Sequence, residues 1–136
     1  MIVDDNYLSA EGIEKNIDWE TLNAEIIHVC YNGTSAIEAM KKEPADLIIS
    51  DIEMPDLDGI SMSRQALEIN PMVKIILISA YDKFEYARRA LLLGALDYIE
   101  KPLDYAYLIQ KVKNAFALME KEQKNLQLLK QSRPLL

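Results

Sequence analysis

Short, almost continuous apolar runs alternate along the chain with segments in which apolar residues recur every three or four positions. Runs of the first kind predict strands that are buried on both faces of a parallel sheet. The predicted strands are Met1–Val3, Ala24–Tyr31, Asp46–Ser50, Val73–Ser79 and Ala95–Ile99. With the segments between them they form five consecutive βα units. The pattern therefore predicts an α/β fold, in which a doubly wound five-stranded parallel sheet has helices on both faces.

Polar side chains beside turns mark where the intervening helices begin. We expect Asn6 to cap the first helix and Thr34 or Ser35 to cap the second. A third and a fourth helix are predicted at Gly59–Ile69 and Phe84–Leu93, followed by a proline and a glycine that end them. The apolar positions expected on the first two helices are Leu8, Ile13, Ile17, Ile37 and Met40.

The last predicted helix begins after Pro102 and keeps a helical composition to about Gln131. Its first half has one apolar face, which includes Leu108 and Val112, and its second half is mostly polar with a few leucines. Two interpretations of residues 119–136 stay open: a solvated tail of a core helix, or a linker helix that leads to an output domain outside this chain. The apolar repeats are too few to establish a coiled coil.

Composition narrows the class of protein. The 136 residues suit one compact domain, and the net charge of −7 opposes binding to nucleic acid while suiting a cation or a basic partner. Cys30 is the single cysteine, which is typical of a reducing compartment. No apolar run reaches the roughly 18 residues of a membrane span, and Met1 leads directly into the first strand without a signal peptide. We expect a cytoplasmic domain without membrane contact.

Acidic residues follow two of the predicted strands. Asp4 and Asp5 stand directly behind the first strand, and Asp51 stands directly behind the third. If the strand order is flavodoxin-like, these strands are neighbours and their carboxyl ends flank the crevice where ligands bind. Like charges held close together resist ionisation, and a divalent cation removes that conflict. Hard oxygen ligands with room for water favour Mg²⁺ over zinc or copper.

Two other strand ends carry groups that suit a phosphoryl ligand. Ser79 closes the fourth predicted strand, and Lys101 follows the fifth, directly before Pro102. A hydroxyl donor and a compact ammonium group are what a phosphoryl group beside a metal ion needs. Each residue alone carries little information, because serines often end strands. The hypothesis depends on the set of five: Asp4, Asp5, Asp51, Ser79 and Lys101.

Four motifs follow one another along the chain: Val3-Asp4-Asp5, Asp51-Ile-Glu-Met-Pro-Asp-Leu-Asp-Gly59, Ile78-Ser79-Ala80 and Gly94-Ala-Leu-Asp-Tyr-Ile-Glu-Lys101-Pro102. Their order and content resemble bacterial response-regulator receiver domains, a resemblance that covers about residues 1–118. It implies the strand order 2-1-3-4-5 and a phosphorelay function. Two further segments, Ile17-Asp18-Trp19-Glu20 and Ser79-Ala-Tyr-Asp-Lys-Phe-Glu-Tyr86-Ala87, look like receivers that are joined to AraC-type helix-turn-helix output domains.

The resemblance also implies roles for the site residues. A sensor histidine kinase would transfer a phosphoryl group from its phosphohistidine to Asp51, with Mg²⁺ as cofactor. The metal ligands would be Asp4, Asp5, Asp51 and the backbone carbonyl of Glu53. Lys101 and Ser79 would bind the phosphoryl oxygens.

In that family the signal spreads through a switch pair, which here is Ser79 and Tyr98. The surface formed by the fourth helix, the fifth strand and the fifth helix would then change, usually for dimerisation. Glu53 and Tyr81 occupy positions that tune how long the phosphoryl group survives. The chain would bind DNA only through an output domain that it does not include, and it would not be an enzyme beyond slow self-dephosphorylation.

Two other functions use some of the same residues. An aspartate-nucleophile phosphatase would employ Asp51 as nucleophile and Glu53 as an acid, but it has no use for the adjacent pair Asp4 and Asp5. A receiver-like docking module would never be phosphorylated. All five site positions hold competent residues, which argues against that second alternative.

Overall fold

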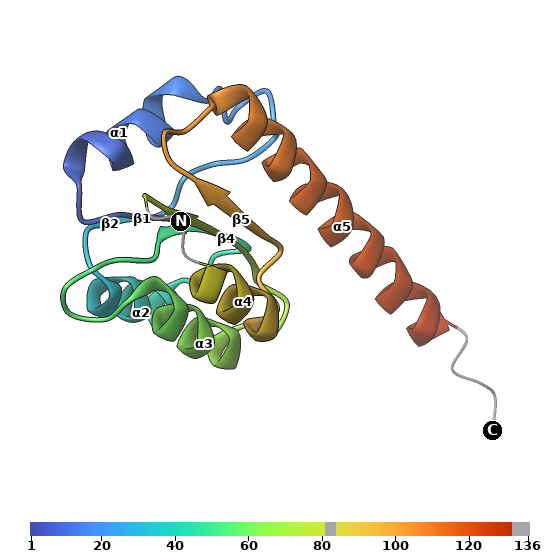
Figure 1. Cartoon of the computed structure of the whole chain (residues 1–136). Helices are drawn as coiled ribbons and strands as arrows, with labels where there is room; N and C mark the ends of the chain where they lie inside the picture. Colours follow the sequence, from blue (N-terminus) through green and yellow to red (C-terminus); the bar gives the residue numbers. More distant parts are fainter. Residues whose placement is uncertain (81–83, 132–136) are drawn as a thin grey trace.

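The computed structural model describes residues 1–80 and 84–131. A five-stranded parallel sheet lies at its centre in the order β2-β1-β3-β4-β5, which confirms the predicted fold class and strand order (Figure 1). The strands are β1 (Ile2–Val3), β2 (Val29–Cys30), β3 (Leu47–Asp51), β4 (Lys74–Ser79) and β5 (Asp97–Glu100). Because every strand runs in the same direction, all the carboxyl ends meet at one edge of the sheet.

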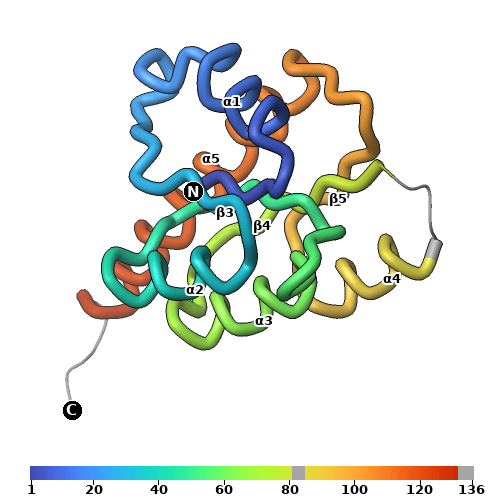
Figure 2. Tube along the Cα trace, turned by 90° about the vertical axis from the view of Figure 1, so that its left-hand side faces the viewer, coloured from blue at the N-terminus to red at the C-terminus, as the bar shows by residue number. Residues whose placement is uncertain are grey.

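Helices cover both faces of the sheet. One face packs against α1 (Tyr7–Asn16) and α5 (Tyr105–Gln131), and the other against α2 (Gly33–Lys42), α3 (Gly59–Ile69) and α4 (Phe84–Leu93). Figure 2 shows the second group together on one side of the sheet, with α1 on the opposite side. Side chains alternate between these layers along each strand: in β4, Ile75 and Leu77 join one cluster while Ile76 and Ile78 join the other.

The second strand is shorter than the sequence predicts. The apolar pattern extends over Ala24–Tyr31, but only Val29 and Cys30 pair in the sheet. This strand lies at the edge and pairs only with β1, whose two residues set the length of the ladder. Apolar periodicity reports burial, whereas a strand also needs a partner along its whole length. Cys30 is buried, as predicted for a small hydrophobic residue in a strand.

Two details of the first helices also differ from expectation. The side chain that caps α2 belongs to Asn32, whose Oδ1 accepts a hydrogen bond from the Ser35 backbone N–H at 2.8 Å, so neither Thr34 nor Ser35 is the cap. Asn6 caps α1 as predicted. On that helix, however, Leu8 is exposed, and Ile17 lies just beyond the last turn, although it is buried. A cap is fixed by backbone geometry, which residue preference alone does not determine.

The long last helix is anchored by its first half. Leu108 and Val112 are buried against the sheet, as predicted, and so is Ala115. Further along, Glu122 accepts a hydrogen bond from the Nζ of Lys74 at 2.8 Å and so connects α5 to the start of β4. Beyond that point the helix extends away from the sheet (Figure 1). Its leucines there are exposed. Among the described residues, no helix is long and apolar enough to cross a membrane.

Candidate functional site

Three carboxylates converge where β1 and β3 end. Asp51 is the last residue of β3, and Asp4 and Asp5 follow β1, which pairs with β3 through Val3 and Ser50. One oxygen from each carboxylate lies within 4.8 Å of the others. Asp4 and Asp51 are buried, whereas Asp5 is exposed. The sequence-based expectation that these three carboxylates converge is therefore confirmed.

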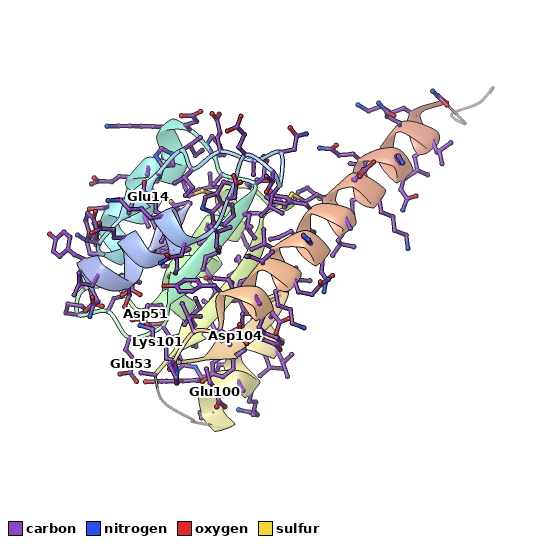
Figure 3. All side chains as sticks on the ribbon, turned by 90° about the horizontal axis from the view of Figure 1, so that it is seen from above. Glu14, Asp51, Glu53, Glu100, Lys101 and Asp104 are labelled. Atoms are coloured by element: carbon purple, nitrogen blue, oxygen red, sulfur yellow. The ribbon has the colours of Figure 1, made fainter. Side chains whose placement is uncertain are left out.

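Lys101 supplies positive charge to this cluster. Its Nζ lies 3.4 Å from Oδ2 of Asp4 and 3.5 Å from Oδ2 of Asp51. Figure 3 shows Lys101 beside Asp51 at the same edge of the sheet, with Glu53 nearby. The lysine follows β5 directly, and its backbone N–H donates to the Ser79 carbonyl at 2.8 Å. The Lys101–Pro102 peptide bond is cis. Sheet pairing thus carries Lys101 to the acidic cluster from the far end of the chain.

Burial dominates the electrostatics of Asp51. Burial is the largest cause and the nearby charge of Asp4 the next; together they raise the pKa of Asp51 from 3.8 to about 6, although Lys101 partly offsets them. A single lysine therefore does not neutralise the cluster. A divalent cation beside the three carboxylates would neutralise it, and the donor set consists only of hard oxygens, which suits Mg²⁺. The residues present thus fit the metal that the sequence implies.

The other two predicted residues lie on the neighbouring strands. Ser79 is buried at the end of β4, where its register partner is Glu100, the residue before Lys101. Tyr98 lies two residues earlier on β5, is partly buried, and packs against the core cluster shared with α4. The structure therefore brings Ser79 to the edge of the sheet that holds Asp51. Tyr81 lies outside the described residues.

Two aspartates of the loop between β3 and α3 fix the conformation of that loop, although the sequence did not identify them as site residues. Asp58 caps α3, and its Oδ1 accepts from the Ile60 and Ser61 backbone N–H groups at 2.9 Å each. Asp56 reaches the start of α2, where its Oδ2 accepts from the backbone N–H of Thr34 at 3.0 Å. The hydrogen bond that Asp56 accepts from the Thr34 hydroxyl, followed by the one from the Thr34 backbone N–H, holds the pKa of Asp56 far below its usual range. The Asp-Leu-Asp-Gly segment was the available signal, since aspartate before glycine is typical of a capped helix start.

Residues 1–113 match the model of the response regulator receiver domain family. The chain belongs to this family. As a receiver domain it is similar to the REC domain of AraT from Geobacillus stearothermophilus, with 34% identity and a TM-score of 0.84 over 90% of this chain and 95% of the other. It is also similar to a two component transcriptional regulator AraC from Clostridium phytofermentans, with 31% identity and a TM-score of 0.80 over 91% of this chain and 95% of that one.

Curated relatives are longer than this receiver. Similarity to the transcriptional regulatory protein YesN of Bacillus subtilis is 28% identity over 90% of this chain but only 33% of YesN. Similarity to the transcriptional regulatory protein HptR of Staphylococcus aureus is 30% identity over 79% of this chain and 42% of HptR. The chain thus spans less than half the length of these regulators. The resemblance to receivers of AraC-type regulators is confirmed by the structural neighbours.

The raised pKa of Asp51 predicts the behaviour of the metal-free receiver. The pKa of Asp51 is about 6 in the folded state and 3.8 in the unfolded state. Ionisation of Asp51 therefore destabilises the folded state, and this loss of stability grows as the pH rises from the lower value to the higher one. We expect Asp51→Asn to increase the free energy of unfolding by about 1 to 2 kcal/mol at pH 8, because the neutral amide avoids both the cost of burying the Asp51 charge and its repulsion from Asp4. At pH 4 the gain should almost vanish. Urea unfolding in a chelator at both pH values measures this, and an equal gain at both would contradict it.

Proposed function

We propose that this receiver accepts a phosphoryl group on Asp51 from the phosphohistidine of a sensor histidine kinase, with Mg²⁺ as cofactor. In this reaction a carboxylate oxygen of Asp51 bonds to phosphorus. The P–N bond breaks, and its electron pair stays on the imidazole nitrogen of the kinase. The observation that supports the proposal most strongly is the position of Asp51 at a strand end, with the Asp4 and Asp5 carboxylates and the Lys101 ammonium group around it. The buried carboxylate is a competent nucleophile once nearby positive charge offsets its own.

The metal site would consist of the Asp4, Asp5 and Asp51 carboxylates and the backbone carbonyl of Glu53. When bound, Mg²⁺ would offset the negative charge of the carboxylates and of the incoming phosphoryl group. The exposure of Asp5 leaves the site open to solvent on one side. A chain of the CheX–CheY–BeF3–Mg²⁺ complex from Borrelia burgdorferi is similar to this one, with 30% identity and a TM-score of 0.73 over 85% of this chain and 86% of that chain. The BeF3 and Mg²⁺ in that complex support the proposal for this receiver.

Lys101 and Ser79 would bind the phosphoryl oxygens. The Lys101 ammonium lies close to both Asp4 and Asp51, so it can contact an oxygen of a group attached to Asp51 with little movement. The Ser79 hydroxyl would move toward the new negative charge, and Tyr98 would follow into the space that the serine side chain leaves. Ser79 lies on β4, the strand next to β3, and Tyr98 lies on β5, the strand beyond it. These movements would alter the surface of α4, β5 and α5.

The rest of the proposal concerns the longer protein. We propose residues 1–118 as the receiver body and residues 119–136 as a helical linker toward a DNA-binding output domain, of which residues 132–136 lie outside the described part. YesN and HptR, both named transcriptional regulators and both much longer than this chain, support an output domain of that type. The receiver would work in the cytoplasm, could form a homodimer through α4, β5 and α5, and would turn over no substrate beyond slow loss of its own phosphoryl group.

Incubation with a small acyl phosphate and Mg²⁺ tests the proposal. We expect intact-protein mass spectrometry to show one added phosphoryl group, absent in Asp51→Asn and absent when a chelator removes the metal ion. Glu68→Gln, which changes one exposed acid remote from the strand ends, should label like the parent chain. An unlabelled parent chain would leave a docking module as the function. Steady hydrolysis of a simple phosphate ester would instead indicate a phosphatase.

A further inference from the structure

A cleft of about 430 Å³ separates the segment after β3 from α4. One wall consists of Ile52–Pro55 and Asp58, which lie directly behind the proposed phosphoacceptor. The other wall consists of Tyr86 and Arg89, which are three positions apart and so lie on one face of α4. The metal and phosphoryl roles proposed above use neither of the two α4 side chains. The cleft therefore places two polar side chains of α4 against the loop that carries Glu53.

Polar contacts cross this cleft. The Tyr86 hydroxyl donates a hydrogen bond to the Glu53 carboxylate, a bond that raises the pKa of Tyr86, as do burial and the charges of Glu53 and Asp58. Arg89 faces Asp58 and helps to lower the pKa of that carboxyl group. Asp58 in turn caps α3. Both ends of the loop, at Glu53 and at Asp58, thus interact with the same face of α4.

We propose that Tyr86 is a positioning residue for the metal site, because its hydroxyl holds the Glu53 side chain and with it the Glu53 backbone. The inference rests on the proposed function, in which the Glu53 carbonyl is a metal ligand. Glu53 is only two residues beyond Asp51, and its side chain and its carbonyl share one Cα atom. A loop that is fixed in advance binds a ligand more tightly than a loop that must be ordered on binding. Helix α4 is therefore part of what prepares the site for Mg²⁺.

Calorimetric titration of the receiver with MgCl₂, without any phosphoryl donor, tests this directly. We expect Tyr86→Phe to raise the Kd for Mg²⁺ about 3- to 10-fold, the effect of losing one partly exposed hydrogen bond to a carboxylate. Labelling by the acyl phosphate should then need correspondingly more Mg²⁺ but should reach the parent maximum when Mg²⁺ saturates. The ring of Tyr86 stays in place in this variant, so packing is preserved. A merely structural role would lower the maximum and leave the Mg²⁺ requirement unchanged.

Tyr107→Phe is the matched control. The Tyr107 ring lies beside the Lys111 ammonium group on α5, so this variant also removes a hydroxyl close to a charged side chain, but away from the cleft. It should bind Mg²⁺ like the parent chain. In a Glu53→Ala background, Tyr86→Phe should have no further effect, because its partner is already gone. If the parent chain binds Mg²⁺ and is labelled normally, an unchanged Kd in Tyr86→Phe would overturn this inference and leave the proposed function standing. An unlabelled parent chain would instead overturn the proposed function.

Discussion

Replacing Asp4 with asparagine is expected to weaken Mg²⁺ binding about 10- to 100-fold and to slow labelling of Asp51 to the same extent at limiting Mg²⁺. The carboxylate of Asp4 is buried, so its charge is poorly screened, and it lies within 4.8 Å of the other two acids. Affinity for a hard cation depends on how many charged oxygens surround it. The amide oxygen of asparagine can still accept the hydrogen bond that the Asn6 backbone N–H now donates to Asp4 at 2.9 Å. The fold should therefore persist while the cation is lost.

Glu68→Gln removes the same single charge from an exposed position on α3 and serves as the control. Its Kd for Mg²⁺ should equal that of the parent chain within a factor of about two, because exposed charges beyond a screening length interact weakly. Calorimetric titration in the same buffer measures both variants. An Asp4→Asn variant that keeps the parent affinity would show that the acidic cluster is not the metal site.

The second large effect is expected from Gly59→Ala, which should lower the free energy of unfolding by about 3 kcal/mol. A Cβ atom at Gly59 would overlap the backbone carbonyl oxygen of Asp51 and lie 2.9 Å from the Cα of Ile52. Both neighbours are backbone atoms of the site itself, so neither can turn aside as a side chain would. Gly59 is also fixed from both sides, since its N–H donates to the Ile52 carbonyl at 2.7 Å and its carbonyl accepts from the Ser63 hydroxyl at 2.6 Å.

Gly12→Ala is the control, because it adds the same methyl group without a clash with backbone atoms. There the added Cβ would overlap the hydroxyl of Tyr105, the far end of a side chain that can move. Alanine is also the better helix former in the middle of α1. The unfolding free energy should change by less than about 1 kcal/mol. Urea unfolding of both variants, together with acyl phosphate labelling of the folded fraction, separates stability from site geometry. A Gly59→Ala variant as stable as the Gly12→Ala one would refute the close approach to Asp51.

The strand-end residues could be predicted because parallel topology makes position along the chain equivalent to position in space. Once β1 and β3 are neighbours, the acids that follow them must meet, and pairing of β4 with β5 brings Lys101 to the same edge. The alternation of apolar runs and capped helices was sufficient to obtain the sheet and its helical layers. None of these inferences required knowledge of a side-chain conformation.

The sequence was less informative where a partner or a backbone angle decides the outcome. The length of β2 depends on how many residues β1 offers for pairing, which the apolar pattern of Ala24–Tyr31 does not contain. The cap of α2 depends on where the backbone turns, and three neighbouring polar residues could each have served. Contacts across the cleft between Glu53 and Tyr86 join residues far apart in sequence, so no local pattern reports them.

The most direct test of Asp51 as phosphoacceptor locates the phosphoryl group on the chain. After labelling with an acyl phosphate and Mg²⁺, reduction with borohydride converts a phosphorylated aspartate to homoserine, and peptide mass spectrometry identifies the changed residue. We predict homoserine at position 51 and at no other aspartate. Homoserine at Asp4 or Asp5, or a stable phosphate on a serine such as Ser79, would contradict the assignment of Asp51.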